Sequence, residues 1–202
     1  AHQEARGADG PAREEVAARR AVGELDPLAL REQVHGTVAA LNAMGIGRED
    51  RVAIVLNNGP EMATAFISVA AGASSAPLNP AYRADEFEFY LADLNAKGLV
   101  VEAGSSSPAV EVARKLGVRL IELHPLRESG AGRFELRADG GATGAPARPG
   151  PAQADDIALV LHTSGTTSRP KIVPLSQRNL CASARHIART LQFSANDRGL
   201  NV

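Results

Sequence analysis

The sequence predicts an α/β domain, a mostly parallel β-α-β layered sheet with helices on both faces. Short apolar runs alternate with longer segments in which apolar residues recur every three or four positions. Glycine and proline separate the two kinds of segment. Of the 202 residues, 44% are hydrophobic, which is enough for a large core. This alternation is typical of a parallel sheet, because each pair of parallel strands needs a crossover connection, usually a helix.

The first half of the chain shows the alternation most clearly. Leu30, Val34 and Val38 follow helical spacing. Gly45 ends this pattern, so a helix is expected over residues 28–44. The elements expected after it are a strand at 51–56, a helix at 60–71, a strand at 74–78, a helix at 84–94, a strand at 99–101, a helix at 108–116 and a strand at 119–123.

One stretch in this half, residues 62–82, carries no charge over a length that could cross a bilayer. Gly72 and Pro77 divide it, and its serine and threonine side chains suit lipid poorly. We therefore expect a buried helix followed by a buried strand, and no membrane span.

The remaining segments are less regular. Residues 1–23 are expected to be loosely ordered, with a weak helix at 12–20. Residues 129–155 are rich in Gly, Ala and Pro. They predict a surface excursion with a short strand at 134–137 and an irregular loop at about 138–154. An apolar strand is expected at 157–161, and a later helix should begin after Ser176 as its N-cap.

The segment after this last strand is rich in hydroxyl groups and contains one glycine and one lysine. Its candidate ligand-binding residues are Thr163, Ser164, Gly165, Thr166, Thr167, Ser168 and Lys171. Hydroxyl and backbone N–H groups donate to phosphate oxygens, a lysine adds a cation, and glycine permits close approach of the backbone. The sequence therefore predicts an anion-binding loop at the end of a strand.

Two observations refine this prediction. The spacing lacks the second glycine of G-x-x-x-x-G-K-[ST], so the loop is not of that P-loop type. Pro170 and Pro174 disfavour a helix directly after Lys171, and an extended segment is expected at 171–175. A Ser/Thr/Gly/Pro run by itself is typical of a flexible linker. The strand before it and the ordered segments after it favour the binding loop.

Composition excludes several other classes. Twenty-two basic and 23 acidic residues give a formal charge of −1, and tryptophan is absent, which argues against a nucleic-acid surface. The single cysteine, Cys181, excludes an internal disulfide and suits a reducing cytoplasm. The five histidines show no metal-ligand spacing, so no protein metal site is predicted. His162 is the histidine next to the loop, where contact with a ligand stays open.

These residues resemble the adenylate-forming enzymes, which include acyl-CoA synthetases and the adenylation domains of peptide synthetases. Their phosphate loop reads T-S-G-T-T-G-x-P-K-G-V, and residues 163–173 read TSGTTSRPKIV. Residues 69–79, VAAGASSAPLN, are similar to the family segment L-K-A-G-x-x-x-V-P-L-D/N. Ser168 and Ile172 stand where the family has glycine, and neither change removes a donor. Members near the oxalate–CoA ligases look most similar.

The resemblance implies a reaction in two steps. ATP, with Mg²⁺, activates a carboxylic acid as acyl-AMP, and the thiol of coenzyme A then displaces AMP. The resemblance assigns contacts with the ATP phosphates to the loop residues named above, with Lys171 as the catalytic cation. The alternatives are an adenylation domain that loads a carrier protein and a non-catalytic nucleotide-binding or interaction module.

The resemblance also implies how the domain is organised. Residues 24–202 would be the first part of the large N-terminal domain, with the C-terminal part of the enzyme absent from the chain. Leu200 and Val202 would then begin a strand without neighbours. Because unpaired apolar edges associate, self-association through this edge is expected.

Overall fold

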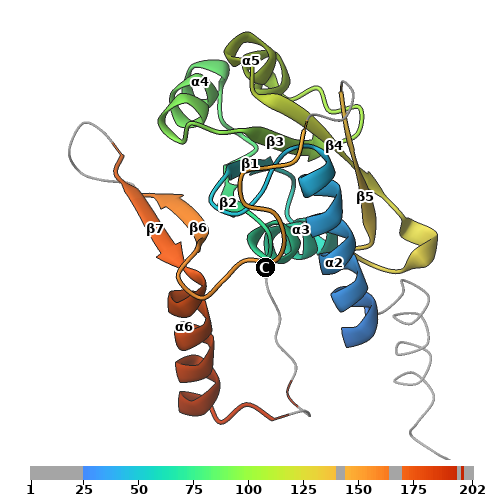
Figure 1. Ribbon diagram of the computed structural model, residues 1–202, viewed down its shortest axis with the longest axis vertical. Coiled ribbons are helices and arrows are strands. Elements are labelled where there is room, and N and C mark those ends of the chain that lie inside the picture. Colours follow the sequence, from blue (N-terminus) through green and yellow to red (C-terminus); the bar gives the residue numbers. More distant parts are fainter. Residues whose placement is uncertain (1–24, 140–143, 164–169, 195–196, 198–202) are drawn as a thin grey trace, which may run out of the picture.

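A single sheet organises the computed structural model, which describes residues 25–139, 144–163, 170–194 and 197 (Figure 1). Within these residues the sheet has seven strands in the order β5-β4-β3-β1-β2-β6-β7. Strands β1 to β4 and β6 pair in parallel, whereas β5 and β7 pair antiparallel at the two edges. The predicted mostly parallel α/β class is therefore confirmed. The strands are β1 Arg51–Val55, β2 Ser74–Pro77, β3 Gly98–Glu102, β4 Arg119–Pro125, β5 Phe134–Ala138, β6 Ile157–His162 and β7 Ile172–Ser176.

Helices cover both faces of the sheet, and strand β1 shows why. Val52 and Ile54 lie in one buried cluster with residues of α2 and α3. Ala53 and Val55 lie in a second cluster with residues of α4 and α5. Because successive side chains of a strand point to opposite faces, an almost wholly apolar strand needs a cover on each side. The helices are α2 Pro27–Ala43, α3 Pro60–Ala70, α4 Ala84–Asp93, α5 Pro108–Leu116 and α6 Gln177–Thr190, with a short 3₁₀ turn, η1, at Arg127–Ser129.

Local signals account for the helix ends. Asp26 caps α2, because its carboxylate accepts hydrogen bonds from the backbone N–H groups of Leu28 and Ala29, each at 2.8 Å. Ser107 caps α5, which ends at Gly117 in the left-handed region with a φ of 68°. Ser176 caps α6, as predicted. The expected elements from residue 28 onward are present within two residues of the predicted bounds.

The uncharged stretch at 62–82 forms most of α3 and the whole of β2, and Gly72 lies between them. In the part of the chain that the structure describes, no helix is both long enough and apolar enough to cross a membrane. Two expectations lie outside the described residues. They are the weak helix at 12–20 and the strand edge at Leu200 and Val202.

Strands β6 and β7 form an antiparallel hairpin at one end of the sheet. A single registered pair, Ser75 and Leu159, joins β6 to β2. Helix α6 follows the hairpin and extends away from the other helices (Figure 1). Its predicted amphipathic pattern is present, but none of its residues is buried, and Ile187 is 51% exposed. The helix is therefore a continuation of the hairpin, not part of the core.

The Gly/Ala/Pro-rich segment from residue 144 onward lies on the body of the domain. The N–H of Arg48 donates to the carbonyl of Arg148 at 2.9 Å. The N–H of Gly150 donates to Oδ1 of Asn42 at 2.7 Å. These bonds hold the segment against the turn between α2 and β1, so an irregular sequence still follows a defined path to β6.

Gly47 lies where this segment comes closest to the turn. A methyl group at Gly47 would overlap the carbonyl oxygen of Arg148 and lie 2.9 Å from Cβ of Pro146. We predict that Gly47→Ala destabilises the domain by about 1–3 kcal/mol, because backbone atoms would have to move. Urea unfolding measures the change. Gly36→Ala, in the exposed interior of α2 with nothing within 4 Å, is the matched control and should stabilise by about 0.5–1 kcal/mol. Equal effects of the two substitutions would contradict the prediction.

Candidate functional site

The candidate site is the connection between β6 and β7. His162, the last residue of β6, pairs with Ile172, the first of β7. One step beyond this pair, the N–H of Thr163 donates to the carbonyl of Lys171 at 2.9 Å. The N–H of Lys171 donates in return to Oγ1 of Thr163 at 3.1 Å. We call Thr163 and Lys171 the stem, because they hold the two ends of the loop side by side.

Two of the predicted ligand-binding residues, Thr163 and Lys171, are thus brought together by the ladder of the hairpin. The others lie outside the described residues: Ser164, Gly165, Thr166, Thr167 and Ser168. No described residue forms an ion pair with Lys171, and its side chain is exposed. Its charge is therefore open to an anionic ligand at the base of the loop.

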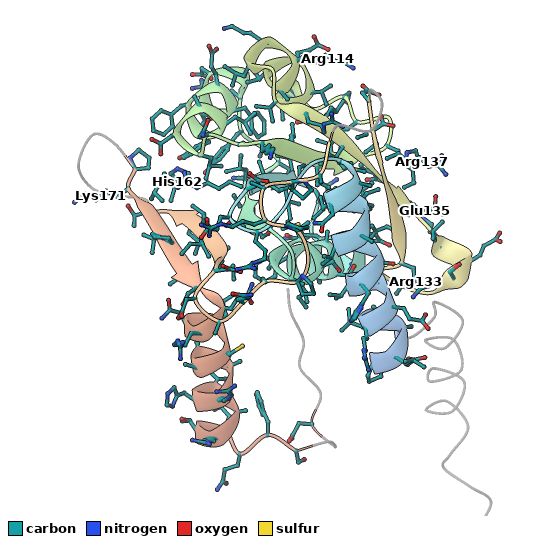
Figure 2. All side chains as sticks on the ribbon, viewed as in Figure 1. Arg114, Arg133, Glu135, Arg137, His162 and Lys171 are labelled. Atoms are coloured by element: carbon teal, nitrogen blue, oxygen red, sulfur yellow. The ribbon has the colours of Figure 1, made fainter. Side chains whose placement is uncertain are left out.

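The stem lies at the carboxyl edge of the sheet. Strand β6 runs parallel to β2, so its last residue, His162, lies at the same edge as the ends of the other parallel strands. Ligands of open parallel sheets bind in crevices outside the carboxyl ends of the strands. Figure 2 shows His162 and Lys171 at this end of the hairpin, next to the connection between β6 and β7.

Only 7% of the side chain of His162 is accessible, compared with 38% for Asp93. Its Nε2 lies 3.0 Å from Oδ2 of Asp93, the last residue of α4. Its ring packs edge-on against Tyr90, with a centroid distance of 4.7 Å. Tyr90 in turn stacks on Tyr82 at 4.9 Å, and the hydrogen bond to Tyr90 raises the pKa of Tyr82 to about 12.

Sequence reasoning placed His162 next to the loop but missed the residues that hold it. Tyr90 and Asp93 are about 70 positions earlier in the chain, on a helix whose acidic residues read as a solvated face. A usable signal was the pair of tyrosines, Tyr82 and Tyr90, because they are the only tyrosines in the sequence. Tyr82 precedes α4, and Tyr90 lies in the second half of that helix.

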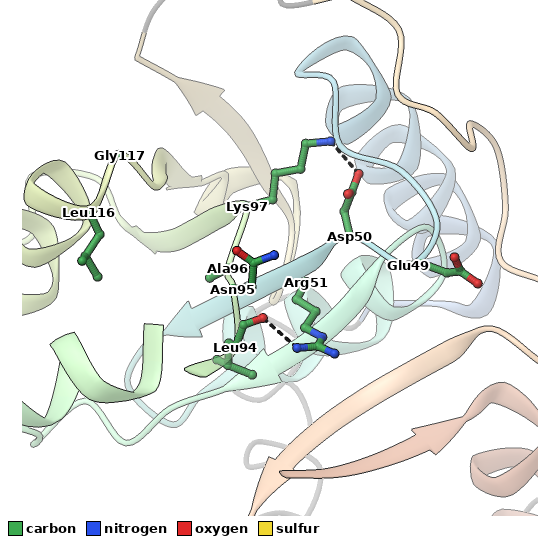
Figure 3. Close-up of a pocket in the computed structure, with 9 residues that line it drawn as sticks. All are labelled: Glu49, Asp50, Arg51, Leu94, Asn95, Ala96, Lys97, Leu116 and Gly117. Atoms are coloured by element: carbon green, nitrogen blue, oxygen red, sulfur yellow. Dashed lines mark hydrogen bonds and ion pairs between the residues drawn. The ribbon is translucent and has the colours of Figure 1, made fainter. Parts of the chain in front are cut away.

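A polar cavity of about 510 Å³ lies at the opposite edge, beside the amino ends of β1, β3 and β4 (Figure 3). Its cationic groups already have partners. Lys97 forms an ion pair with Asp50 at 2.9 Å, and Arg51 donates to the carbonyl of Leu94 at 2.9 Å. This cavity therefore offers an anion less free charge than the stem does.

The described residues do not supply a metal site. No three His, Cys, Asp or Glu side chains gather among them in a way that could hold an ion.

A parallel α/β sheet with a hydroxyl-rich loop at its carboxyl edge defines a class of nucleotide-binding domain. The model of the family described as AMP-binding enzyme matches residues 28–202. The chain belongs to this family of adenylate-forming enzymes.

Three relatives illustrate the similarity. The chain is 40% identical over 154 residues to an oxalate–CoA ligase of Arabidopsis thaliana, a match that covers 76% of the chain and 30% of the relative. It is 34% identical to the salicyl-AMP ligase / salicyl-S-ArCP synthetase of Mycobacterium tuberculosis, with 87% of the chain and 32% of the relative covered. Among solved structures, ATP-bound MatB from Rhodopseudomonas palustris is 26% identical with a TM-score of 0.64, and the match covers 84% of the chain and 33% of that structure. The chain thus spans about a third of the length of each of these proteins.

Proposed function

We propose that this chain is the ATP-binding part of an acid–CoA ligase. In the first step an oxygen of a carboxylate attacks the α-phosphorus of ATP. The bond from that phosphorus to the bridging oxygen breaks, which gives acyl-AMP and pyrophosphate. In the second step the sulfur of coenzyme A, after losing its proton, attacks the acyl carbon and releases AMP. The observation that carries the proposal is the stem at the carboxyl edge of the sheet, where Thr163 and Lys171 close a family-type loop. Lys171 forms no ion pair with any residue that the structure describes.

Each proposed contact has a physical role. The substrate is a polyanion, and charge builds on the leaving pyrophosphate, so donors fixed in advance stabilise the transition state without reorganising. Lys171 would place its ammonium group on the β- and γ-phosphates as the catalytic cation. Gly165 would let the backbone approach the phosphates closely. The hydroxyl and N–H donors proposed for the same phosphates are Thr163, Ser164, Thr166, Thr167 and Ser168.

We further propose that residues 24–202 form part of the adenylation domain and that the acid site and much of the coenzyme A site are built by other parts of the enzyme. The similarity to an oxalate–CoA ligase supports a short acid as the substrate. A cytoplasmic location is proposed because the one cysteine suits a reducing compartment.

A carrier-protein acceptor is the second candidate. It is favoured by the 34% identity to a protein named both as an AMP ligase and as an S-ArCP synthetase. Both candidates share the first step and differ only in the thiol that takes the acyl group. A non-catalytic module, the third alternative, would bind nucleotide and transfer nothing.

The test is pyrophosphate exchange with a panel of short and aromatic acids, oxalate included. An enzyme of full family length that carries residues 28–202 should incorporate labelled pyrophosphate into ATP only when its acid is present. The 202-residue chain by itself should show no exchange above background, because it supplies the phosphate loop without the acid site. Exchange by the chain alone, or none by the full-length enzyme with any acid, would overturn the proposal. Thioester formation with coenzyme A then separates the two acceptors.

A further inference from the structure

A row of aromatic rings runs from the hydrophobic core to the stem of the phosphate loop. Phe87, fully buried, contacts Tyr82 edge-on with centroids 5.8 Å apart. Tyr82 stacks on Tyr90 at 4.9 Å, and Tyr90 contacts His162 at 4.7 Å. The row ends at Asp93, whose Oδ2 lies 3.0 Å from Nε2 of His162. The residue that follows His162 belongs to the stem.

The hairpin needs such a contact, because its two ends are held differently. At the end away from the loop, the hydroxyl of Ser74 donates to the carbonyl of Ile157 at 2.8 Å, and the guanidinium of Arg48 pairs with the carboxylate of Asp156 at 2.6 Å. Toward the loop, no registered pair between β6 and β2 follows that of Ser75 and Leu159 among the described residues. The polar contact that joins the loop end to the body, among the described residues, is the one between His162 and Asp93.

We infer that His162, held by Asp93 and Tyr90, is a positioning residue that fixes the place of the stem. A buried side chain with a carboxylate on one side and a ring on the other has a single orientation, and it transmits that orientation to the adjacent backbone. Thr163 and Lys171 would then present their donors at a fixed place outside the sheet. Helix α4 would act on the nucleotide through the stem, without touching it.

The inference rests on the proposed function of the loop. It predicts that loss of the Asp93 carboxylate weakens anion binding, whereas simple electrostatics predicts tighter binding. Asp93→Asn removes a negative charge close to an anion site, so Coulomb's law alone predicts tighter binding of an anion. Loss of positioning predicts the opposite, because the stem would no longer be held. Asparagine keeps the size of the side chain, so the fold should be retained.

The experiment uses the 202-residue chain with inorganic tripolyphosphate as the probe in calorimetric titration. Asp93→Asn and His162→Ala should each raise the dissociation constant about 3- to 10-fold, and the double variant should add little, because both act through one contact. The matched controls are Asp85→Asn, exposed on the same helix, and His186→Ala, exposed on α6. Both controls should leave the dissociation constant unchanged.

Hydrogen–deuterium exchange supplies a readout that does not depend on any ligand. The amides of Thr163 and Lys171, each hydrogen-bonded across the stem, should exchange faster in Asp93→Asn while amides of β1 and β3 keep their rates. Equal or tighter binding by Asp93→Asn together with unchanged exchange at the stem would overturn the inference. If the unsubstituted chain binds neither tripolyphosphate nor ATP, the proposed function of the loop fails. The exchange rates then decide by themselves whether Asp93 holds the stem.

Discussion

Replacing Lys171 by alanine in an enzyme of full family length should slow adenylation by roughly 30- to 1000-fold, which corresponds to a loss of about 2–4 kcal/mol of transition-state stabilisation. The reason is the placement of its charge at the stem, where no described residue forms an ion pair with it. Negative charge develops on the leaving pyrophosphate, and a cation fixed there acts mainly on the transition state. Single-turnover formation of acyl-AMP measures the effect.

The second half-reaction separates this role from a structural one. Thioester formation from presupplied acyl-AMP should be unaffected by Lys171→Ala, because no pyrophosphate leaves in that step. Lys115→Ala is a matched control, since Lys115 is an exposed lysine on α5 that pairs with Glu88 at 2.7 Å. It should change neither half-reaction. Equal losses in both half-reactions, with the fold intact, would remove Lys171 from the phosphate site.

Replacing Asp156 by asparagine should cost about 2–3 kcal/mol of folding free energy at neutral pH, because it leaves the guanidinium of Arg48 without its carboxylate. The two form a paired contact, with Nε of Arg48 2.6 Å from Oδ2 and the second guanidinium nitrogen 3.1 Å from Oδ1. Asp156 also accepts a hydrogen bond from the N–H of Gln153 at 2.6 Å. Its side chain is only 8% accessible, and it directly precedes β6, so this contact anchors the far end of the hairpin.

The pH dependence gives the same contact a second test. The hydrogen bond from Arg48 holds the pKa of Asp156 below its ordinary value. A carboxyl group with a depressed pKa in the folded state stabilises the fold above its unfolded pKa, and this contribution disappears as the pH falls through the folded pKa. The difference in unfolding free energy between the unsubstituted chain and Asp156→Asn should therefore narrow below about pH 4.

Urea unfolding at pH 7 and at several acid pH values checks this expectation. Asp85→Asn serves as the control, because Asp85 pairs with Arg83 at 3.3 Å on the exposed surface, where such a pair contributes less than about 1 kcal/mol. Two results would show that the paired contact does not anchor the hairpin. The loss of unfolding free energy in Asp156→Asn could stay constant down to acid pH, or it could be no larger than the loss in Asp85→Asn.

Short-range chemistry determined much of this protein. The period of apolar residues is enough to indicate α2 to α5 and the strands between them, because each pattern depends on neighbours within a few turns or pleats. Ser176 as the N-cap of α6 and Pro170 as a barrier to an immediate helix are local effects as well. The anion-binding role of the loop after β6 stays a prediction, which rests on hydroxyl, glycine and lysine side chains in one run.

Tertiary structure decided how these pieces support one another. Strand β7 returns antiparallel beside β6 and so brings Thr163 to Lys171. The spacing of apolar residues along the sequence does not specify this pairing. The contact of His162 with Asp93 joins residues 69 positions apart, and that of Arg48 with Asp156 joins residues 108 positions apart. Both depend on the strand order, which places α4 next to β6 and the α2–β1 turn next to its start. Periodicity sets which face of an element is apolar, whereas the partner of each face is set by the packing of the whole sheet.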